Sequence, residues 1–543
     1  MLKEYGLPAA DFFPGARVVL IPVSLLGALV CFFWAREFGG RFAGVLAVAL
    51  WCFDPNILAW GATITPDVGA AAFGVLAAYL FSRWLRNPCP RTVLWAGVGL
   101  GLAELTKATW IILFAVWPLV WFVWDRAFGK RTEPIGSATH SDAGQAQQDG
   151  PVESSSYPAA KRPTARQLAM ILILGLYLLN LGYGFEGTGQ LLGDFTFYSK
   201  TLGGDQPESA GGNRFRNSVL RYVPVPVPAN YLCGIDLQKK DFEQNRWSYL
   251  RGEHRRGGWW YYYLYAFLVK TPLGFVLLYV TAVVAGCLNI VRRWLPPLDR
   301  GPHGGAGDEP LSRGSRSMPR ESERPVDAES NLFTVAIPGI AVFVLVSSQT
   351  GINAYFRYAL PALPFLMICT AVMTTRLIRS DRRSLSAKCR MWPAVGLVVC
   401  GIAESLAVFP YSMSFFNLAV GGPMNGRFHL LDSNIDWGQD VLEFRQWVTE
   451  HPEARPLFAD LSGPLPLKML GIDARPLVSH PRPVTRVLTA EPRLQPGWYA
   501  VSVNHLMEYC RQESPYSSGC EYLRELQPVV TIGYSIYIYH VRE

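Results

Sequence analysis

Long apolar runs recur along most of this sequence and restrict the folds open to it. A run of about 20 apolar residues can cross a bilayer as an α-helix, because each helical residue adds about 1.5 Å of rise. The runs that reach or approach this length are 16–35, 42–60, 67–85, 92–105, 108–125, 167–186, 273–291, 332–348, 358–377 and 392–411. We therefore predict a polytopic α-helical membrane protein with about ten spans. The run 92–105 is the weakest of them.

The charge content agrees with a membrane protein. Of the 543 residues, 50% are hydrophobic and only 17% are charged, which is less charge than a soluble chain of this length carries. The formal net charge is +8, but the excess of Lys and Arg lies in short loops between the apolar runs. The positive-inside rule accounts for this distribution, so we expect membrane lipid, and no nucleic acid, as a partner.

The basic loops also predict the orientation of the chain. Lys and Arg gather in every second loop, and the positive-inside rule places that side in the cytoplasm. These residues are Arg36, Arg41, Arg83, Arg86, Arg91, Lys130, Arg131, Lys161, Arg162, Arg166, Arg292, Arg293, Arg376, Arg379, Arg382, Arg383, Lys388 and Arg390. Both termini, the loop 187–272 and the segment after Tyr411 are then expected on the outer side. Residues 1–15 lack the order of a removable signal peptide, so we expect insertion to rely on the spans.

This pattern predicts two domains. Residues 1–414 are expected to form the multi-span membrane domain, and residues 415–543 a small extracytoplasmic α/β domain. The loops 133–160 and 299–330 are rich in Gly, Ser and Pro and have almost no aromatic residues. We expect both loops to be disordered insertions on the cytoplasmic side.

The C-terminal segment has the pattern of an α/β unit. An amphipathic helix is indicated by the helical period of Val441, Phe444, Trp447 and Val448. We expect strands near 456–461 and 498–503, and a closing strand pair within 529–541. The chain has ten cysteines, of which only Cys510 and Cys520 look suited to a disulfide in an oxidising compartment.

Four charged residues lie where the spans meet the outer surface: Asp67, Lys107, Lys270 and Arg357. Three of them are basic on the side where basic residues are disfavoured. A group of Lys and Arg at this depth favours an anionic ligand, and a lipid phosphate fits both the charge and the level. The group therefore predicts a binding site.

Each of these charges also has a simpler interpretation. A single Lys or Arg can extend to the headgroups or pair with a neighbour, as Lys107 could with Glu104. The sequence leaves both interpretations open for any one residue. Glu404 is a separate carboxyl within the run 392–411, and the sequence indicates no partner for it.

An aromatic cluster at 259–263 precedes the span that begins near 273. Aromatic residues gather at membrane interfaces, so an interfacial belt is the default interpretation of Trp259, Trp260 and Tyr261 to Tyr263. Direct contact of these residues with a ligand is the alternative.

The stretch 429–443, HLLDSNIDWGQDVLE, lies between the last span and the C-terminal unit. Asp432, Asn434, Asp436 and Glu443 have the spacing of calcium-loop ligands, so a divalent cation stays open as a cofactor. The glycine of such a loop is one place late, at Gly438.

A helix start is the plainer interpretation of this stretch. Asp436 as N-cap with Gln439 three residues later would form a capping box ahead of the amphipathic helix. This arrangement leaves Asp432 and Asn434 unexplained.

Seven stretches of the chain resemble a known family when they are taken in order. They are PNILAWGATITPDV, GVGLGLAELTK, YGFEG, GGWWYYYLYAFLVKTPL, INAYFRYALPALPF, YSMSFFNLAVGGPMNGRFHLLDSNIDWGQD and GYSIYIY. Together they resemble bacterial members of the dolichyl-phosphate-mannose protein mannosyltransferase-like family, which are membrane glycosyltransferases of the GT-C fold. The resemblance covers most of the chain from about residue 17, excluding the loops 133–160 and 299–330.

The resemblance implies a function at the bacterial plasma membrane. Family members transfer a sugar from a polyprenyl-phosphate carrier to a protein or glycan acceptor at the outer face. Asp67 matches the family's acidic position at the mouth of an early span and is the candidate catalytic residue. Lys107, Lys270 and Arg357 match basic positions that would face the carrier phosphate. Cations at that point would stabilise the charge of the phosphate leaving group. The matching stretches add further substrate-binding candidates: Glu186, Trp259, Trp260, Asp432, Asn434 and Asp436.

The sequence departs from the family pattern at its start. The family's catalytic base is an acidic residue of the first outer loop, which follows a first span, whereas Met1 falls near the end of that loop and only Glu4 and Asp11 are available there. We therefore expect the chain as written to bind carrier lipid and to transfer little or no sugar. A version extended upstream by one span and an acidic loop is expected to regain turnover.

Three functions compete on the sequence alone. The first is a glycosyltransferase that uses a polyprenyl-phosphate sugar. The second is a non-catalytic lipid-sugar-binding or scaffold protein on the same fold. A transporter is the third and weakest, because the spans show no inverted repeat and, apart from Glu404, few ionisable groups near their centres.

Overall fold

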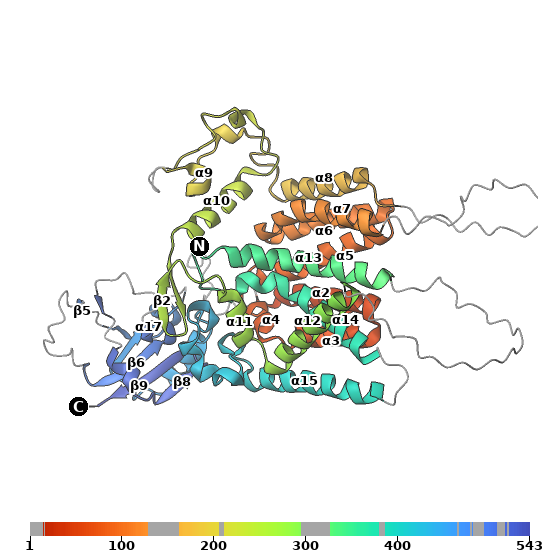
Figure 1. The fold of residues 1–543 in the computed structure, drawn as a ribbon. Coiled ribbons are helices and arrows are strands. Elements are labelled where there is room, and N and C mark those ends of the chain that lie inside the picture. The colour runs from red at the N-terminus through yellow and green to blue at the C-terminus, as the bar shows by residue number, and fades with distance from the viewer. Residues whose placement is uncertain are drawn as a thin grey trace, which may run out of the picture.

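The computed structural model shows a helical bundle joined at one end to a small α/β domain (Figure 1). It describes residues 15, 17–128, 162–205, 211–294, 326–379, 386–463, 466–477, 480–481, 494–507, 516–517 and 521–542. The predicted polytopic helical fold with a C-terminal α/β unit is confirmed. The predictions for 133–160, 299–325, Cys510 and Cys520 lie outside the described residues, whereas residues 326–330 of the second predicted loop are helical and begin α13 (Val326–Ser348), so the prediction of disorder was wrong for them.

The first half of the bundle follows the predicted apolar runs. Its helices are α2 (Leu20–Gly39), α3 (Arg41–Cys52), α4 (Pro55–Gly61), α5 (Asp67–Arg86), α6 (Pro90–Thr106), the 3-10 turn η1 (Ala108–Ile112), α7 (Leu113–Phe128) and α8 (Ala165–Gly182). The run 42–60 forms two helices, α3 and α4, which meet at 58°. The break occurs at Asp54, whose side chain accepts hydrogen bonds from the backbone N–H groups of Asn56 and Ile57 and so caps α4.

The second half of the bundle supplies four more long helices. They are α12 (Leu273–Trp294), α13 (Val326–Ser348), α14 (Leu363–Arg379), which continues the 3-10 turn η6 (Phe356–Ala362), and α15 (Ser386–Val408). Among the described residues, six helices are long and apolar enough to cross a membrane, and the bent pair α3–α4 is a seventh candidate. The apolar parts of α12 and α13 are shorter. The protein is therefore an integral membrane protein.

Helix α6 corresponds to the weakest predicted span. It packs closely against α8, because a Cβ atom at Gly97 would lie 2.8 Å from Leu174 and one at Gly101 would lie 2.5 Å from Leu178. Small residues at such positions allow two helix backbones to approach, which is a common way for membrane helices to associate. Close packing against α8 therefore holds the short helix α6 in the bundle.

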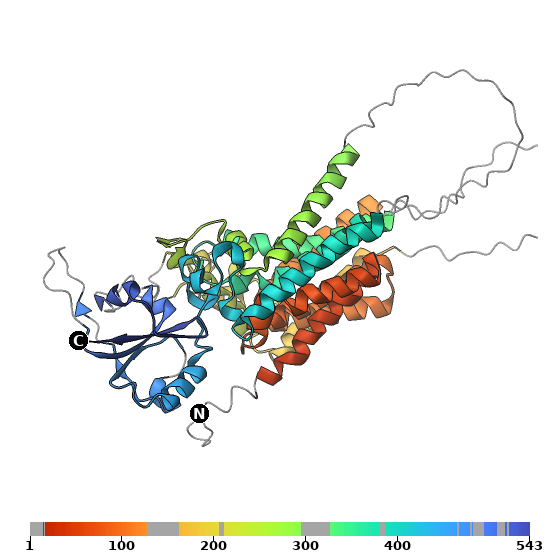
Figure 2. The same cartoon turned by 90° about the horizontal axis from the view of Figure 1, so that it is seen from below.

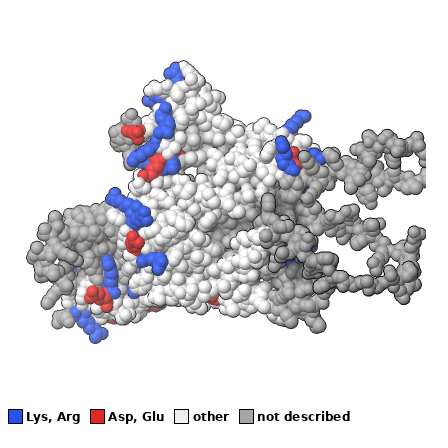
Figure 3. All heavy atoms as spheres, in the orientation of Figure 1, with Lys and Arg blue, Asp and Glu red and all other residues white. Residues whose placement is uncertain are grey.

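The ends of the bundle differ as the basic loops predict. The α/β domain and residues 183–272 lie at one end, and the chain enters and leaves the undescribed segments after α7 and α12 at the other (Figures 1 and 2). A broad band almost without charged side chains separates the two ends on the face shown in Figure 3. The assignment of the α/β end to the outer side of the membrane stays a prediction, and "outer" below refers to that end.

The segment between α8 and α12 forms an outer layer of short elements. These are η3 (Leu192–Asp194), α9 (Lys200–Gly203), η4 (Val219–Tyr222), α10 (Ala229–Glu243), the antiparallel pair β1 (Trp247–Leu250) and β2 (Glu253–Arg256), and α11 (Tyr262–Lys270). In the aromatic cluster, Trp260 is 74% exposed, as a belt residue would be, whereas Trp259, Tyr262 and Tyr263 are buried in the protein. The belt interpretation was therefore wrong for these three residues.

The α/β domain is built on a five-stranded sheet of order β4-β3-β6-β9-β8. Its strands are β3 (Leu457–Asp460), β4 (Arg475–Pro476), β6 (Gly497–Ser502), β8 (Val530–Ile532) and β9 (Ile536–Val541). Strand β3 is parallel to β4 and β6, and β9 is antiparallel to β6 and β8. The predicted strands and closing strand pair are thus confirmed.

Helices and short turns complete the C-terminal region. They are η7 (Ser412–Ser414), η8 (Leu418–Val420), η9 (Pro423–Phe428), η10 (Asp432–Asn434), α16 (Val441–Glu450), η11 (Leu467–Leu470), α17 (Val503–Leu506), α18 (Glu521–Glu525) and the pair β5 (His480–Pro481) and β7 (Tyr516–Ser517). Helix α16 buries Phe444, Trp447 and Val448 in the core of the domain, as its helical period predicts. Phe416, Leu430 and Ile435 instead share one buried cluster with the membrane helices. Residues 412–440 therefore connect the two parts by packing against both.

Candidate functional site

Asp67, Lys107 and Arg357 meet at the outer end of the bundle. Asp67 is the first residue of α5 and is buried, Lys107 follows the last residue of α6, and Arg357 lies in η6 ahead of α14. Lys107 Nζ lies 2.7 Å from Asp67 Oδ1, and Arg357 Nε lies 3.9 Å from Asp67 Oδ2. The structure thus brings together three of the four charges that the sequence placed at this level.

Aromatic rings surround the two cations of this cluster. The Arg357 guanidinium lies 5.0 Å from the ring centre of Trp60, 4.8 Å from Tyr355 and 4.6 Å from Trp437. Lys107 Nζ lies 5.2 Å from the ring centre of Tyr358. Ring faces attract cations electrostatically, so these contacts hold both side chains in place.

The cluster carries an excess of positive charge. Two basic side chains face one carboxylate, and the Lys107 and Arg357 side chains are only 12% and 14% exposed. Arg357 Nε is buried and has no hydrogen-bond partner among the described residues, since Asp67 is too distant for one. An anion with several oxygen atoms would satisfy both the charge and this N–H group.

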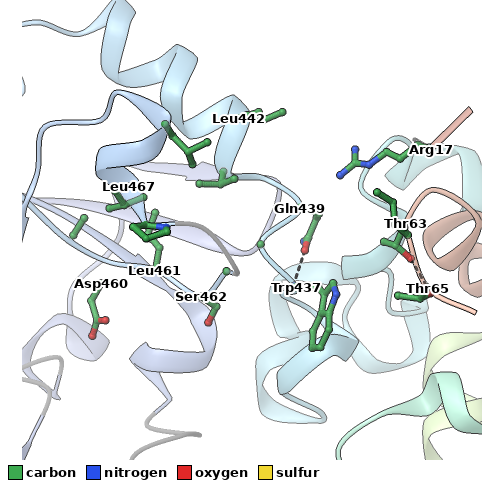
Figure 4. Close-up of a pocket in the computed structure, with 17 residues that line it drawn as sticks. Arg17, Thr63, Thr65, Trp437, Gln439, Leu442, Asp460, Leu461, Ser462 and Leu467 are labelled. Carbon is green, nitrogen blue, oxygen red and sulfur yellow. Dashed lines mark hydrogen bonds between the residues drawn. The ribbon is translucent and has the colours of Figure 1, made fainter. Parts of the chain in front are cut away.

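Two cavities adjoin the cluster and its aromatic neighbours. One, of about 580 Å³, separates the outer end of α4 and α5 from the α/β domain, and Thr63, Thr65 and Trp437 line the part of it next to the cluster. Figure 4 shows these residues facing Leu461, Ser462 and Leu467 across the cavity. The other, of about 300 Å³, reaches Lys107 and Tyr358. The rest of its lining is mainly apolar and comes from η1, α10 and α13: Ile111, Ile235, Phe242, Leu345 and Val346.

Lys270 is placed elsewhere, in the protein interior at the end of α11. Its Nζ donates to the backbone carbonyls of Met413 and Asn434, both at 2.6 Å. Burial lowers the pKa of Lys270 to about 7, and the nearby carboxyl of Asp54 opposes this shift. In the structure Lys270 ties α11 to the C-terminal segment and is not part of the Asp67 cluster.

The polar side chains of 429–443 also bind protein groups. Asn434 Nδ2 donates to the carbonyls of Ala354 and Leu431, both at 2.8 Å, and its Oδ1 accepts from the N–H of Phe356 at 3.2 Å. Through Phe356, Asn434 positions the residue next to Arg357. Asp432 accepts from the N–H of Ser433 at 2.5 Å.

Asp436 faces the sheet and not Asp432 or Asn434. Its Oδ1 accepts from the N–H of Gly438 at 2.8 Å, and its Oδ2 accepts from the hydroxyl of Ser502. Among the described residues no group of three or more His, Cys, Asp or Glu side chains has a geometry that could hold a metal ion. The calcium-loop arrangement is therefore not formed by these residues.

The predicted capping box was wrong. Helix α16 begins at Val441 after Asp440, which makes no side-chain cap. Gln439 instead donates to the carbonyl of Ile435 and to Asp440 Oδ2, both at 2.9 Å. Tertiary partners for Gln439 and Asp436 compete here with the local cap.

The other candidates lie outside the cluster. Glu186 is exposed and accepts from Asn230 at 3.4 Å, and the N–H of buried Trp259 donates to Asn353. Lys107 does not pair with Glu104, because Glu104 accepts from the hydroxyl of Tyr231 at 2.6 Å. Glu404 has two backbone partners near the outer end of α15, the N–H groups of Leu273 and Leu418, both at 2.7 Å.

The aromatic residues around Arg357 were missed from the sequence. Tyr355 and Tyr358 flank Arg357 in the chain, and this pattern was a usable signal. Trp60 and Trp437 come from distant segments, and nothing local in the sequence links them to Arg357.

Comparison with known proteins finds a family model that matches the N-terminal part of the chain. Residues 13–138, which contain Asp67 and Lys107, match the family model described as "Dolichyl-phosphate-mannose-protein mannosyltransferase". This N-terminal part of the chain is therefore similar to that family. No curated protein matches the chain.

Two solved structures are similar to it at low sequence identity. Both are crystal structures of ArnT from Cupriavidus metallidurans. The match to the apo structure has 13% identity and a TM-score of 0.36, and it covers 96% of this chain and 82% of the ArnT chain. The structure bound to undecaprenyl phosphate has 12% identity and a TM-score of 0.33, with 96% and 83% coverage. At these TM-scores the likeness supports no residue-by-residue comparison.

Proposed function

We propose that this protein, whose residues 13–138 resemble the mannosyltransferase family, transfers a sugar from a polyprenyl-phosphate carrier to a protein or glycan acceptor at the outer face of the membrane. The observation that carries the proposal is the Asp67–Lys107–Arg357 cluster, in which two nearly buried cations face one carboxylate at the outer end of the bundle. A phosphate ester is the anion that this depth and charge favour.

The two cations would bind the carrier phosphate. Breaking the bond between the sugar and the phosphate leaves a phosphate monoester, so negative charge builds up on its oxygens during the reaction. Donors that are already in place stabilise this charge most effectively, and the rings around Arg357 and Lys107 hold both donors in place. The apolar cavity beside Lys107 suits the first part of the polyprenyl chain.

The larger cavity suits the acceptor. It comes next to the cluster at Trp437, shares no lining residue with the apolar cavity, and is also lined by the polar residues Thr63, Thr65 and Gln439. Asp67 would orient the two cations, since its carboxylate is already paired with Lys107. Asn434 and Lys270 would support the site from behind by fixing the chain around Arg357 and the C-terminal segment.

A glycosyl-transfer assay tests this function. Wild type, Lys107→Ala and Arg357→Ala would be compared in the same membranes with polyprenyl-phosphate sugars as donors, and Arg251→Ala would serve as a basic control on the same side of the bundle. In contrast to the sequence-based expectation of little or no transfer, we expect turnover in wild type and in the control, and a loss of at least about 10²-fold in the two cluster variants, as for removal of one charge-stabilising donor. Equal turnover in all four proteins would reject the assigned site.

A non-catalytic carrier-binding protein is the second candidate. The observation that favours it is the engagement of Asp67, whose carboxylate faces two cations and is poorly placed to accept a proton from an acceptor. Wild-type protein that binds undecaprenyl phosphate but transfers no sugar from any donor would support this alternative.

A further inference from the structure

A second group of chemically active side chains lies in the α/β domain. Asp460 is the last residue of β3, Ser462 follows two residues later, and His505 lies in α17 directly after β6. Because β3 and β6 are parallel neighbours, with Asp460 opposite Val501, their carboxyl ends meet at one edge of the sheet. Ligand sites of parallel sheets form at this edge.

The three side chains form a connected series. His505 Nδ1 lies 2.9 Å from Asp460 Oδ1, and His505 Nε2 lies 3.4 Å from Ser462 Oγ. A carboxylate bound at Nδ1 favours the tautomer with the proton on that nitrogen, so Nε2 is left as an acceptor facing the Ser462 hydroxyl. Ser462, His505 and Asp460 are thus arranged like a nucleophile, a base and a group that orients the base. The contact between nucleophile and base is often long in structures without substrate.

A neighbouring serine leaves the Ser462 proton available. The hydroxyl of Ser502 donates to Asp436 Oδ2, so its single proton is already used. Ser502 Oγ lies 3.0 Å from Ser462 Oγ and can only accept from it. The Ser462 hydroxyl can therefore donate to Ser502 Oγ, to the carboxyl of Asp436, with which it also hydrogen-bonds, or to His505 Nε2.

Ser462 is accessible from the larger cavity. Asp460, Leu461 and Ser462 line its wall in the α/β domain, and Figure 4 shows Asp460 and Ser462 on the same side of the chain. The adjoining wall is apolar and consists of Leu442, Leu461, Leu467 and Leu470. An acyl chain fits such a wall, with its carbonyl group at Ser462.

We propose that Ser462, His505 and Asp460 give the α/β domain a separate activity, the cleavage of acyl esters. Ser462 Oγ would form a bond to the ester carbonyl carbon while its proton passes to His505 Nε2. The bond from that carbon to the alcohol oxygen then breaks, and the alcohol leaves with the proton from His505. Water attacks the acyl-serine in the same way and gives the free acid and the original serine. Asp460 holds His505 in the required tautomer throughout.

The experiment uses the purified full-length protein, a fluorophosphonate probe that reacts with activated serines, and p-nitrophenyl octanoate as the ester. We expect one labelled residue, Ser462 by peptide mapping, and ester cleavage that Ser462→Ala abolishes. His505→Gln should lower the labelling rate by about 10²- to 10⁴-fold, the usual contribution of a general base. Thr449→Ala, a hydroxyl change on the exposed face of α16, should leave both signals unchanged.

Folding is checked by thermal unfolding and by binding of undecaprenyl phosphate, which Ser462→Ala should retain because Ser462 is not in the Asp67 cluster. No labelling of folded wild type, labelling at another serine, or labelling of Ser462 at the same rate in His505→Gln would each overturn the proposal. These results do not depend on sugar transfer, so the two proposed activities can fail separately.

Discussion

Asp67 is the residue on which the two cations of the candidate site depend. Its carboxylate is 3% exposed, and it is paired with Lys107 at 2.7 Å and faces Arg357 at 3.9 Å. A phosphate in this site would compete with Asp67 for the same two cations. Asp67 and the proposed ligand should therefore substitute for each other electrostatically.

The Asp67→Asn variant tests this substitution. Removing one partner of a buried ion pair usually lowers the free energy of unfolding by about 3–5 kcal/mol. We expect a loss of about 1–3 kcal/mol for Asp67→Asn, because the two cations keep their ring contacts and are partly exposed. Undecaprenyl phosphate should then raise the melting temperature of Asp67→Asn more than that of wild type, since it supplies the missing negative charge. A smaller rise in the variant than in wild type would show that phosphate does not bind between these cations.

The sequence predicted this residue cluster in part. The position of a charged residue relative to the end of an apolar run gives its depth but not its neighbours, so the sequence placed Lys270 at the same level as Lys107 and Arg357. The structure separates Lys270 from them, because the carbonyls of Met413 and Asn434 bind its ammonium group inside the protein. Such hydrogen-bond partners come from distant segments of the chain, and no local sequence pattern indicates them.

At the scale of elements, Glu404 joins the outer ends of two helices. It accepts from the N–H of Leu273, the first residue of α12, and from the N–H of Leu418 in η8. A carboxylate at a helix N-terminus satisfies a free N–H group and interacts favourably with the helix dipole. The sequence placed Glu404 without a partner because its contacts are backbone groups of other elements.

Glu404→Ala should therefore loosen the junction of α12, α15 and η8. We expect a loss of about 1–3 kcal/mol in the free energy of unfolding, since two charge-assisted hydrogen bonds to a partly exposed carboxylate disappear. Glu450→Ala on the surface of α16 is the matched control. Equal melting temperatures for the two variants would contradict this role of Glu404.

Asp440 connects the start of α16 to the turn between β8 and β9. It accepts from the hydroxyl of Ser535 at 2.6 Å and packs against Gly533, where a Cβ would lie 2.1 Å from the carboxyl carbon. Burial raises the pKa of Asp440 to about 8. The folded state therefore holds a proton that the unfolded chain releases near its usual value, about pH 4.

This difference gives a pH dependence with a definite sign. Between about pH 4 and pH 8 the folded state binds more protons than the unfolded state, so the stability should fall as the pH rises through that window. Asp440→Asn keeps an acceptor for Ser535 and should reduce this dependence, as measured by the melting temperature of the α/β domain from pH 5 to pH 8. An unchanged slope in Asp440→Asn would assign the pH dependence to other groups.

Elements were predicted well where one physical effect dominates. Hydrophobic length marks the spans, and periods of 3.6 and 2 mark α16 and the strands of the sheet. The bend between α3 and α4 was missed because the whole run 42–60 is apolar, although Asp54 and Pro55 carried a helix-start signal. The cap at Asp436 failed because Ser502 of a distant strand binds that carboxyl.

At the scale of the whole molecule, the α/β domain and the candidate site share one end of the bundle (Figure 1). A polyprenyl-phosphate donor and an acceptor can meet there only if this end faces the compartment that holds the acceptor. The orientation is therefore as important to the proposed function as the residues of the site.

Cysteine labelling in intact cells tests the orientation. Asn87→Cys lies in the turn between α5 and α6, and Ser218→Cys lies in the outer layer; each would be made in a background without reactive native cysteines. An impermeant maleimide should react with Ser218→Cys and not with Asn87→Cys, because basic loops stay in the cytoplasm. The opposite pattern would show that the protein is inserted the other way round.

The affinity of the purified, folded protein for undecaprenyl phosphate tests the central claim most directly. We expect Arg357→Ala to bind about 10- to 150-fold more weakly than wild type, which corresponds to about 1.5–3 kcal/mol for a charge-assisted contact. Arg357→Lys should recover only part of this loss, since an ammonium group cannot make the two-pronged contact of a guanidinium. Arg251→Ala should bind like wild type. Equal affinities of wild type and a folded Arg357→Ala protein would contradict the assignment of this cluster as the carrier phosphate site.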